Sequence, residues 1–217
     1  MSGTSGKPAD ARAGRRGRLF VISAPSGAGK TSLVRALMKE VPSLAVSTSF
    51  TTRDLRPTEQ NGRDYHFVSK SVFADMVERG ELLEHASVFD NSYGTGRAQV
   101  ESALNRGQDL LLEIDWQGAA QVRKALPEAI SIFILPPSRA SLEQRLRARA
   151  TDSPQVIARR LRDSVTEISH WHEFDYVVEN DVFDQALAQL RAIIEGRGEA
   201  LSGNRAGLAE FVRKLLD

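Results

Sequence analysis

The segment SAPSGAGKTS, residues 23–32, decides the fold expected for the whole chain. It matches the pattern G-x-x-x-x-G-K-[ST] of phosphate-binding loops at every position except the first, where Ala24 stands in place of glycine. The apolar run at residues 19–23 predicts a buried strand before the loop. A stripe of Leu33, Val34 and Leu37 predicts an amphipathic helix over residues 30–40 after it. A loop between a strand and a helix is the context in which this pattern binds nucleotide phosphates.

Eight loop residues are candidates for binding ATP: Ala24, Pro25, Ser26, Gly27, Ala28, Gly29, Lys30 and Thr31. Their backbone N–H groups would surround the phosphates, and the N-terminus of the following helix would add partial positive charge. Lys30 would bridge the β- and γ-phosphates, and the Thr31 hydroxyl would coordinate Mg²⁺. The alternative is an ordinary glycine-rich turn, which the placement of Lys30 and Thr31 between a strand and a helix disfavours.

Ala24 is compatible with this interpretation if its backbone is extended. A positive φ would cost alanine roughly 1–2 kcal/mol. Pro25, however, biases the residue before it toward extended geometry. We therefore predict almost no penalty for alanine at this position.

The composition predicts a packed domain without disulfides or membrane spans. The chain has 217 residues, of which 41% are hydrophobic and 26% charged, and this suits one α/β domain with a modest insertion. The absence of cysteine excludes disulfides, thiolate metal sites and cysteine nucleophiles, and it is compatible with the cytoplasm. No apolar run reaches about 18 residues, so we expect no membrane span. The basic N-terminus also lacks the apolar segment of a secretory signal.

Charge is distributed unevenly along the chain, although the net charge is only +1. Residues 1–18 carry five basic residues and one acidic residue, and the remainder is slightly acidic. We predict that residues 1–17 form a disordered basic tail rather than a nucleic-acid-binding arm, because charge alone carries little specificity. No nucleic-acid partner is expected for the main activity.

Strands and helices alternate in the second half of the chain. Apolar strands are predicted at residues 109–115, 129–135 and 176–178, and helices at 97–105, 117–126, 138–150, 154–171 and 182–195. This alternation predicts an α/β fold with a parallel sheet that is covered by helices. The C-terminal extension, residues 197–217, is predicted to contain one more helix at 208–216.

Residues 45–96 interrupt this alternation. Strands are predicted at 45–49, 65–68 and 82–89, a short helix at 71–80, and a tight turn at Asn61-Gly62. The pattern predicts a compact, β-rich insertion, with residues 49–96 as its substrate-binding part.

Asp115 ends the apolar strand "LLLEID" and is a candidate metal ligand. A carboxylate at the carboxyl end of a parallel strand beside the loop could hold Mg²⁺ directly or through a water. The alternative is an aspartate that only turns the chain into the next helix. Glu113 lies two residues earlier on the same face and receives no role from this pattern.

The insertion carries the groups that would bind the phosphate acceptor. Arg53 and Arg56 lie three residues apart, and guanidinium groups suit a phosphate monoester. Tyr65 and Tyr93 could donate hydrogen bonds to the same phosphate. Glu84 by itself could be an ordinary strand residue, but a carboxylate can also accept from the N1–H and the exocyclic amine of guanine, an edge that adenine lacks.

Several long motifs together resemble those of guanylate kinases: "APSGAGKTSL", "VSTSFTTRDLRPTEQNGRDYHFV", "LLEHASVFDNSYGTG", "LLLEIDWQGAAQV" and "RLRARATDSPQVIARRL". The resemblance covers roughly residues 18–196 and implies a P-loop core with a GMP-binding insertion. It implies transfer of the ATP γ-phosphate to GMP, and to dGMP as a second acceptor, with Mg²⁺. By position, the GMP phosphate would be bound by Ser49, Arg53, Arg56, Tyr65 and Tyr93. Glu84 and Thr95 would recognise guanine, with Thr95 in place of a more frequent serine.

The same resemblance implies a helical lid over about residues 138–160. Arg145, Arg149 and Arg160 would approach the transferring phosphoryl group together with Lys30. Arg147, Arg159 and Arg162 could equally be surface charges. Asn180 would contact adenine or, alternatively, cap the following helix.

Three alternatives remain at this point. A non-catalytic guanylate-kinase-like interaction module is disfavoured by Lys30, Thr31 and the lid arginines. A kinase acting on another small molecule, such as a sugar phosphate, is disfavoured by the joint presence of Glu84 and Thr95 with the phosphate-binding groups. Nucleic-acid binding by the tail would be an added property. The oligomeric state is left open.

Overall fold

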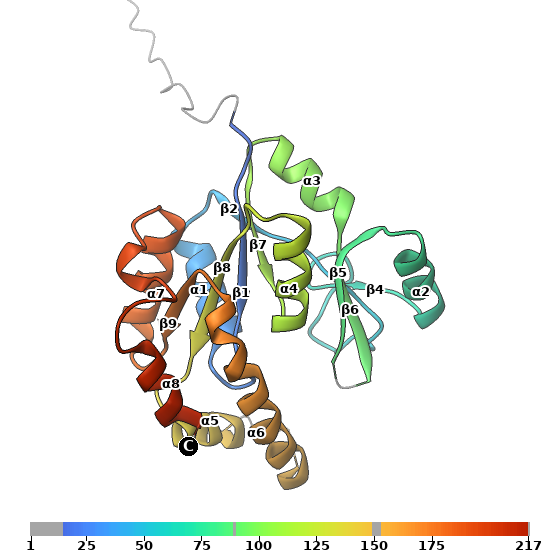
Figure 1. Ribbon diagram of the computed structural model, residues 1–217. Coiled ribbons are helices and arrows are strands. Elements are labelled where there is room, and N and C mark those ends of the chain that lie inside the picture. Colours follow the sequence, from blue (N-terminus) through green and yellow to red (C-terminus); the bar gives the residue numbers. More distant parts are fainter. Residues whose placement is uncertain (1–14, 89, 149–152, 217) are drawn as a thin grey trace, which may run out of the picture.

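A five-stranded parallel sheet forms the centre of the computed structural model (Figure 1), which describes residues 15–88, 90–148 and 153–216. The strand order is β2-β7-β1-β8-β9, and all neighbouring strands are parallel. The strands are β2 (Leu44–Val46), β7 (Asp109–Glu113), β1 (Leu19–Ser23), β8 (Ile130–Leu135) and β9 (Tyr176–Glu179). The predicted α/β fold is confirmed.

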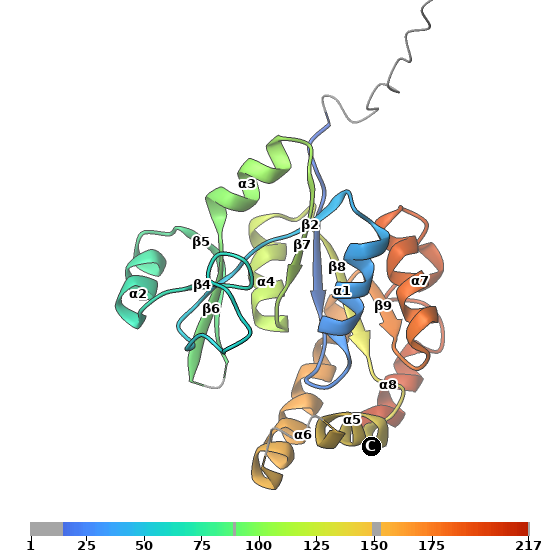
Figure 2. The same ribbon diagram turned by 180° about the vertical axis from the view of Figure 1, so that it is seen from behind.

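The central strand β1 is buried on both faces because helices cover both sides of the sheet. Leu19 and Val21 pack toward α4 (Trp116–Ala125) and α8 (Leu208–Leu216). Phe20 and Ile22 point to the opposite face and pack against α1 (Lys30–Glu40) and α7 (Phe183–Ile194). Figure 2 shows α1 in front of the sheet, on the face opposite α4. A continuous apolar strand is the pattern that such two-sided burial requires.

The insertion forms a separate four-stranded sheet beside the parallel one (Figure 1). Its order is β4-β3-β6-β5, with β4 (His66–Phe67), β3 (Phe50–Thr51), β6 (Asn91–Gly96) and β5 (Leu82–Val88). Helix α2 (Lys70–Glu78) packs on it through Phe73 and Met76, and α3 (Arg97–Asn105) leads back to the core. The prediction that the insertion is rich in β-strands is therefore confirmed.

One strand of this region was predicted with the wrong bounds, and another was not predicted. The strand expected at residues 45–49 ends early: it is β2 (Leu44–Val46), which joins the parallel sheet, and residues 47–49 lie outside any strand, before β3 of the insertion begins at Phe50. Strand β6 was not predicted, because "NSYGTG" contains two glycines and little apolar pattern. It is stabilised by antiparallel pairing with β5, which a local pattern does not reveal.

The segment that was predicted to form a lid contains α5 (Arg139–Ala148) and α6 (Pro154–Ser169), and a short 3-10 helix, η1 (His170–Glu173), follows them. Leu142, Leu146 and Ile157 form a small core of their own between the two helices. In Figures 1 and 2 this pair projects from the end of the sheet at which β1 and β8 finish. None of the helices in the described ranges is long and apolar enough to cross a membrane.

Both ends of the described chain contact the core. Arg15 and Arg18 form ion pairs with Asp109, so residues 15–17, assigned by sequence to the tail, contact the folded domain; residues 1–14 lie outside the described chain. After α7, a second 3-10 helix, η2 (Glu199–Leu201), leads to Arg205, which donates to the carbonyl of Val177 in the edge strand β9 at 2.9 Å. The predicted C-terminal helix is α8.

Candidate active site

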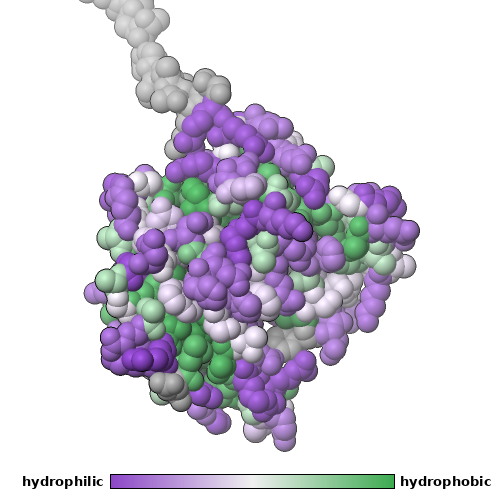
Figure 3. Space-filling model, viewed as in Figure 1, coloured by the Kyte–Doolittle hydropathy of each residue, from purple (hydrophilic) through white to green (hydrophobic). Residues whose placement is uncertain are grey.

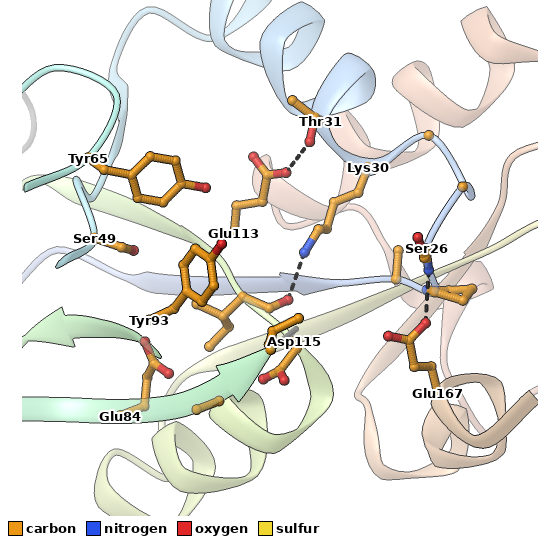
Figure 4. A pocket seen from close by; sticks show the side chains of 17 residues that line it. Ser26, Lys30, Thr31, Ser49, Tyr65, Glu84, Tyr93, Glu113, Asp115 and Glu167 are labelled. Carbon is orange, nitrogen blue, oxygen red and sulfur yellow. Dashed lines mark hydrogen bonds between the residues drawn. The ribbon is translucent and has the colours of Figure 1, made fainter. Parts of the chain in front are cut away.

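A cavity of about 290 Å³ lies where the carboxyl ends of β1 and β7 meet the insertion (Figure 4). It is lined by Ala24, Pro25, Ser26, Gly27, Gly29, Lys30, Thr31, Ser49, Tyr65, Glu84, Ala86, Val88, Tyr93, Glu113, Ile114, Asp115 and Glu167. The phosphate-binding loop and the acceptor region predicted from the sequence therefore line the same cavity. Ligands bind at this edge of open parallel sheets because the loops that follow the strands converge there.

The loop has the backbone geometry expected of a phosphate-binding turn. Gly27 and Gly29 have φ values of 92° and 94°, which side chains rarely allow. A Cβ at Gly29 would also lie 2.4 Å from Nδ2 of Asn180, so only glycine fits there. Among the described residues, Asp90 is the one non-glycine with positive φ, and Ala24 therefore needs no glycine geometry. Ala24 therefore lacks the positive φ that would penalise alanine at this position.

The two reactive side chains of the loop contact the end of β7 (Figure 4). Lys30 Nζ donates to the carbonyl oxygen of Ile114 at 2.9 Å. Thr31 Oγ1 donates to Glu113 Oε1 at 2.5 Å. The carboxylate beside the threonine is thus Glu113, which the sequence left without a role although its position two residues before Asp115 placed it on the same face.

Asp115 caps helix α4 and also lines the cavity. Its Oδ1 accepts from the backbone N–H of Gly118 at 2.8 Å, and its Oδ2 accepts from Gln117 Nε2 at 3.2 Å. The chain-turning role considered for Asp115 is therefore present, and a metal-binding role is compatible with it.

The cavity wall carries side-chain oxygens of the type that Mg²⁺ prefers. The Thr31 hydroxyl and the carboxylates of Glu113 and Asp115 are hard donors, the type that this ion prefers. No cluster of three or more metal-binding side chains exists among the residues the structure describes. Mg²⁺ commonly takes only one or two protein ligands and is otherwise held by substrate phosphates and water.

Glu84 is the buried acid of the insertion, with 3% of its surface exposed. Its Oε1 accepts from the Thr95 hydroxyl at 2.6 Å, and Thr95 is itself fully buried. Burial raises the pKa of Glu84 to about 7, against the opposing effect of the Thr95 hydrogen bond. The sequence paired these two residues through the family resemblance, and the structure places them in direct contact.

Gly118 in α4 leaves room for the side chain of Glu84. The sequence analysis did not predict a role for this glycine. A Cβ at Gly118 would lie 2.5 Å from Glu84 Oε2 and 3.2 Å from its Cδ. No local signal in the sequence identifies this contact, since it joins a strand of the insertion to a helix of the core.

Among the insertion residues expected to bind phosphate, some line the cavity and others do not. Ser49, Tyr65 and Tyr93 line the cavity, and the ring centroids of the two tyrosines are 6.0 Å apart. The Arg53 guanidinium lies behind them, 5.6 Å from the Tyr65 ring, and does not line the cavity. Arg56 is exposed and away from the cavity wall. Burial is the main cause that raises the pKa of Tyr65, so its phenol stays a hydrogen-bond donor.

Arg145 and Asn180 support the loop from outside the cavity. Asn180 is 4% exposed and its Nδ2 donates to the Ala28 carbonyl at 2.7 Å. Arg145 donates to the carbonyls of Asn180 and Ala28 at 2.8 and 3.4 Å. Helix α7 has Val182 as its N-cap with no side-chain hydrogen bond, so the capping role considered for Asn180 is wrong. The buried side-chain amide of Asn180 forms a hydrogen bond with the phosphate-binding loop instead.

The other lid arginines are not part of the cavity wall. Arg160 lies on α6 without lining the cavity, and Arg149 lies outside the described residues. Helix α6 instead contributes Glu167, whose Oε2 accepts from the Ser26 backbone N–H at 2.8 Å. Burial raises the pKa of this carboxyl. The sequence missed Glu167 because nothing near it in the chain marks it as a partner of the loop.

The family model for guanylate kinase matches residues 16–197. The guanylate kinase of Chromohalobacter salexigens is 53% identical over 201 residues, covering 93% of this chain and 94% of that protein. That of Hahella chejuensis is also 53% identical, covering 93% and 97%.

A solved structure shows the same relationship at the level of the fold. The crystal structure of guanylate kinase from Anaplasma phagocytophilum superposes with a TM-score of 0.69 and is 32% identical in sequence. The match covers 91% of this chain and 94% of that one. From the family model, the identity and the coverage together, this chain belongs to the guanylate kinase family.

Proposed function

We propose that this protein transfers the γ-phosphoryl group of ATP to GMP, giving ADP and GDP. The observation that carries the proposal is the shared cavity, in which a phosphate-binding loop faces the buried carboxylate of Glu84. A non-catalytic module would not need Lys30 and Thr31 at the wall of such a cavity. Glu84 can accept from both the N1–H and the exocyclic amine of guanine, a paired donor edge that a sugar phosphate lacks.

On the donor side, the residues after β1 would hold the triphosphate. The N–H groups around Gly27 and Gly29 and the ammonium of Lys30 supply positive charge where the β- and γ-phosphates lie. Lys30 would exchange the Ile114 carbonyl for phosphate oxygens. Mg²⁺ would be held by Thr31, with Asp115 or Glu113 directly or through a water, and when bound it supplies further positive charge to the phosphates.

On the acceptor side, Glu84 would accept hydrogen bonds from the N1–H and the exocyclic amine of guanine. Thr95 fixes the orientation of that carboxylate through its 2.6 Å hydrogen bond. Tyr65, Tyr93 and Ser49 would bind the GMP phosphate from the cavity wall, with Arg53 and Arg56 as its cationic partners. dGMP is an expected second acceptor.

The reaction requires no side-chain nucleophile. An oxygen of the GMP phosphate attacks the γ-phosphorus, the bond to the β–γ bridging oxygen breaks, and ADP leaves with that oxygen. Arg145, Arg149 and Arg160 would reach the phosphoryl group when α5 and α6 close, and closure would exclude water. Asn180 would contact adenine from its place behind the loop.

The test is an assay of ADP release with GMP, dGMP, AMP, CMP and UMP as acceptors. We expect GMP to be used far better than AMP, CMP or UMP, with activity that requires Mg²⁺ and is lost with EDTA. Equal use of AMP, or hydrolysis of ATP without an acceptor, would refute the proposal. The cysteine-free chain is suited to the reducing cytoplasm, which we propose as the site of this reaction.

A further inference from the structure

The segment between β3 and β4 contains an ion pair that links the two arginines proposed to bind the acceptor phosphate. Arg53 Nη2 donates to both carboxylate oxygens of Glu59, at 2.8 and 3.0 Å. The Arg56 backbone N–H donates to Glu59 Oε2 at 3.0 Å, and the Glu59 N–H donates back to the Arg56 carbonyl at 3.0 Å. One carboxylate therefore fixes the side chain of Arg53 and the backbone of Arg56 relative to each other.

This pair is shielded from water, unlike another ion pair in the same insertion. The side chains of Arg53 and Glu59 are each 15% exposed, whereas those of Arg79 and Glu81 are 58% and 47% exposed. Exposed ion pairs contribute little because solvent and side-chain mobility weaken them. Shielded hydrogen bonds are stronger. The hydrogen bond from Arg53 lowers the pKa of Glu59, so the carboxylate stays ionised at neutral pH.

The pair is connected to the cavity through an aromatic side chain. Tyr65 lines the cavity on one side and lies 5.6 Å from the Arg53 guanidinium on the other. The ring of Phe67 lies at the same distance from Arg53, and the Asp54 carbonyl accepts from Nη1 at 2.7 Å. A guanidinium has five N–H donors, so Arg53 can hold Glu59 and a phosphate oxygen at the same time.

We infer that Glu59 is a positioning residue for the acceptor phosphate. It orders Arg53 and the Arg56 turn before substrate arrives, without touching the substrate itself. An arginine that is already ordered loses less conformational freedom on binding, and this loss is one of the main costs of association. The inference rests on the proposed function, which places the GMP phosphate at these arginines.

The test compares Glu59→Gln with Glu81→Gln, a matched change at the exposed pair with Arg79. We expect Glu59→Gln to raise KM for GMP about tenfold, the size of one charged hydrogen bond, while kcat and KM for ATP change less than about twofold. Glu81→Gln should leave all three unchanged. Circular dichroism and thermal unfolding would show that both variants are folded.

A second arm repeats Glu59→Gln in an Arg53→Ala background. Because Glu59 acts through Arg53, the substitution should lower kcat/KM for GMP much less there than in the wild-type background. An equal loss in both backgrounds, or a parallel rise in KM for ATP, would show a general structural role and overturn the inference. An unchanged KM for GMP would also overturn it, and so would a lowered KM, which would mean that Glu59 competes with the phosphate for Arg53. Wild-type protein that does not phosphorylate GMP would overturn the proposed function as well.

Discussion

Replacing Glu84 with glutamine should stabilise the unliganded protein at alkaline pH while removing its preference for guanine. The carboxyl is 3% exposed, and burial raises its pKa from an ordinary value of 4.5 to about 7. At about 1.4 kcal/mol for each pH unit, this difference corresponds to about 3 kcal/mol of stability lost when the buried group ionises. The protein would therefore be less stable because it keeps a charge where guanine binds.

The direction of this pH dependence of stability depends on whether the folded or the unfolded state binds the Glu84 proton more tightly. The folded protein binds this proton more tightly than the unfolded chain, so the cost is absent below pH 4.5, grows as pH rises toward 7, and is complete above 7. Glutamine does not titrate, and its amide oxygen can still accept from the Thr95 hydroxyl. The stability advantage of Glu84→Gln should therefore increase by about 2.5 kcal/mol between pH 5 and pH 8.

Urea unfolding of the wild type and of Glu84→Gln at pH 5, 6.5 and 8 would measure this difference. Groups that titrate in both proteins cancel when the two are compared at each pH. Glu81→Gln, at an exposed position, provides a control whose effect should not vary in this way. A stability difference between the wild type and Glu84→Gln that stays constant across this range would refute the reasoning.

Three further predictions concern the loop and the wall of the acceptor region. Lys30→Ala should nearly abolish turnover while circular dichroism shows a retained fold, because its ammonium serves the phosphates; turnover near wild type would contradict its role. Gly118→Ala should lower kcat/KM for GMP about tenfold with little change in KM for ATP, since the new Cβ would lie 2.5 Å from Glu84 Oε2 and displace it. Steady-state kinetics with each substrate would show this, and an equal effect on both substrates would count against it. Ala24→Gly should leave the ATP affinity measured by calorimetry almost unchanged, and a large gain would mean that the alanine is strained.

Elements with a strong local pattern were predicted with accurate bounds. The strand at Leu19–Ser23 and the helices at Lys30–Glu40 and Arg97–Asn105 agree with the structure at both ends. Their apolar periodicity and flanking residues act within one segment, so a single sequence contains the signal. Strand β6 lacked such a signal because its stability comes from pairing with β5.

The sequence by itself determined the phosphate-binding loop, the α/β alternation and the motifs of the acceptor region, because these depend on residue order and spacing. The tertiary structure decided which groups meet across long separations. It paired Thr31 with Glu113, Ser26 with Glu167, and Asn180 with Ala28. These contacts arise because the order β2-β7-β1-β8-β9 brings the ends of strands that are distant in the chain to one edge. No local pattern encodes such proximity, since it is a property of how whole elements pack.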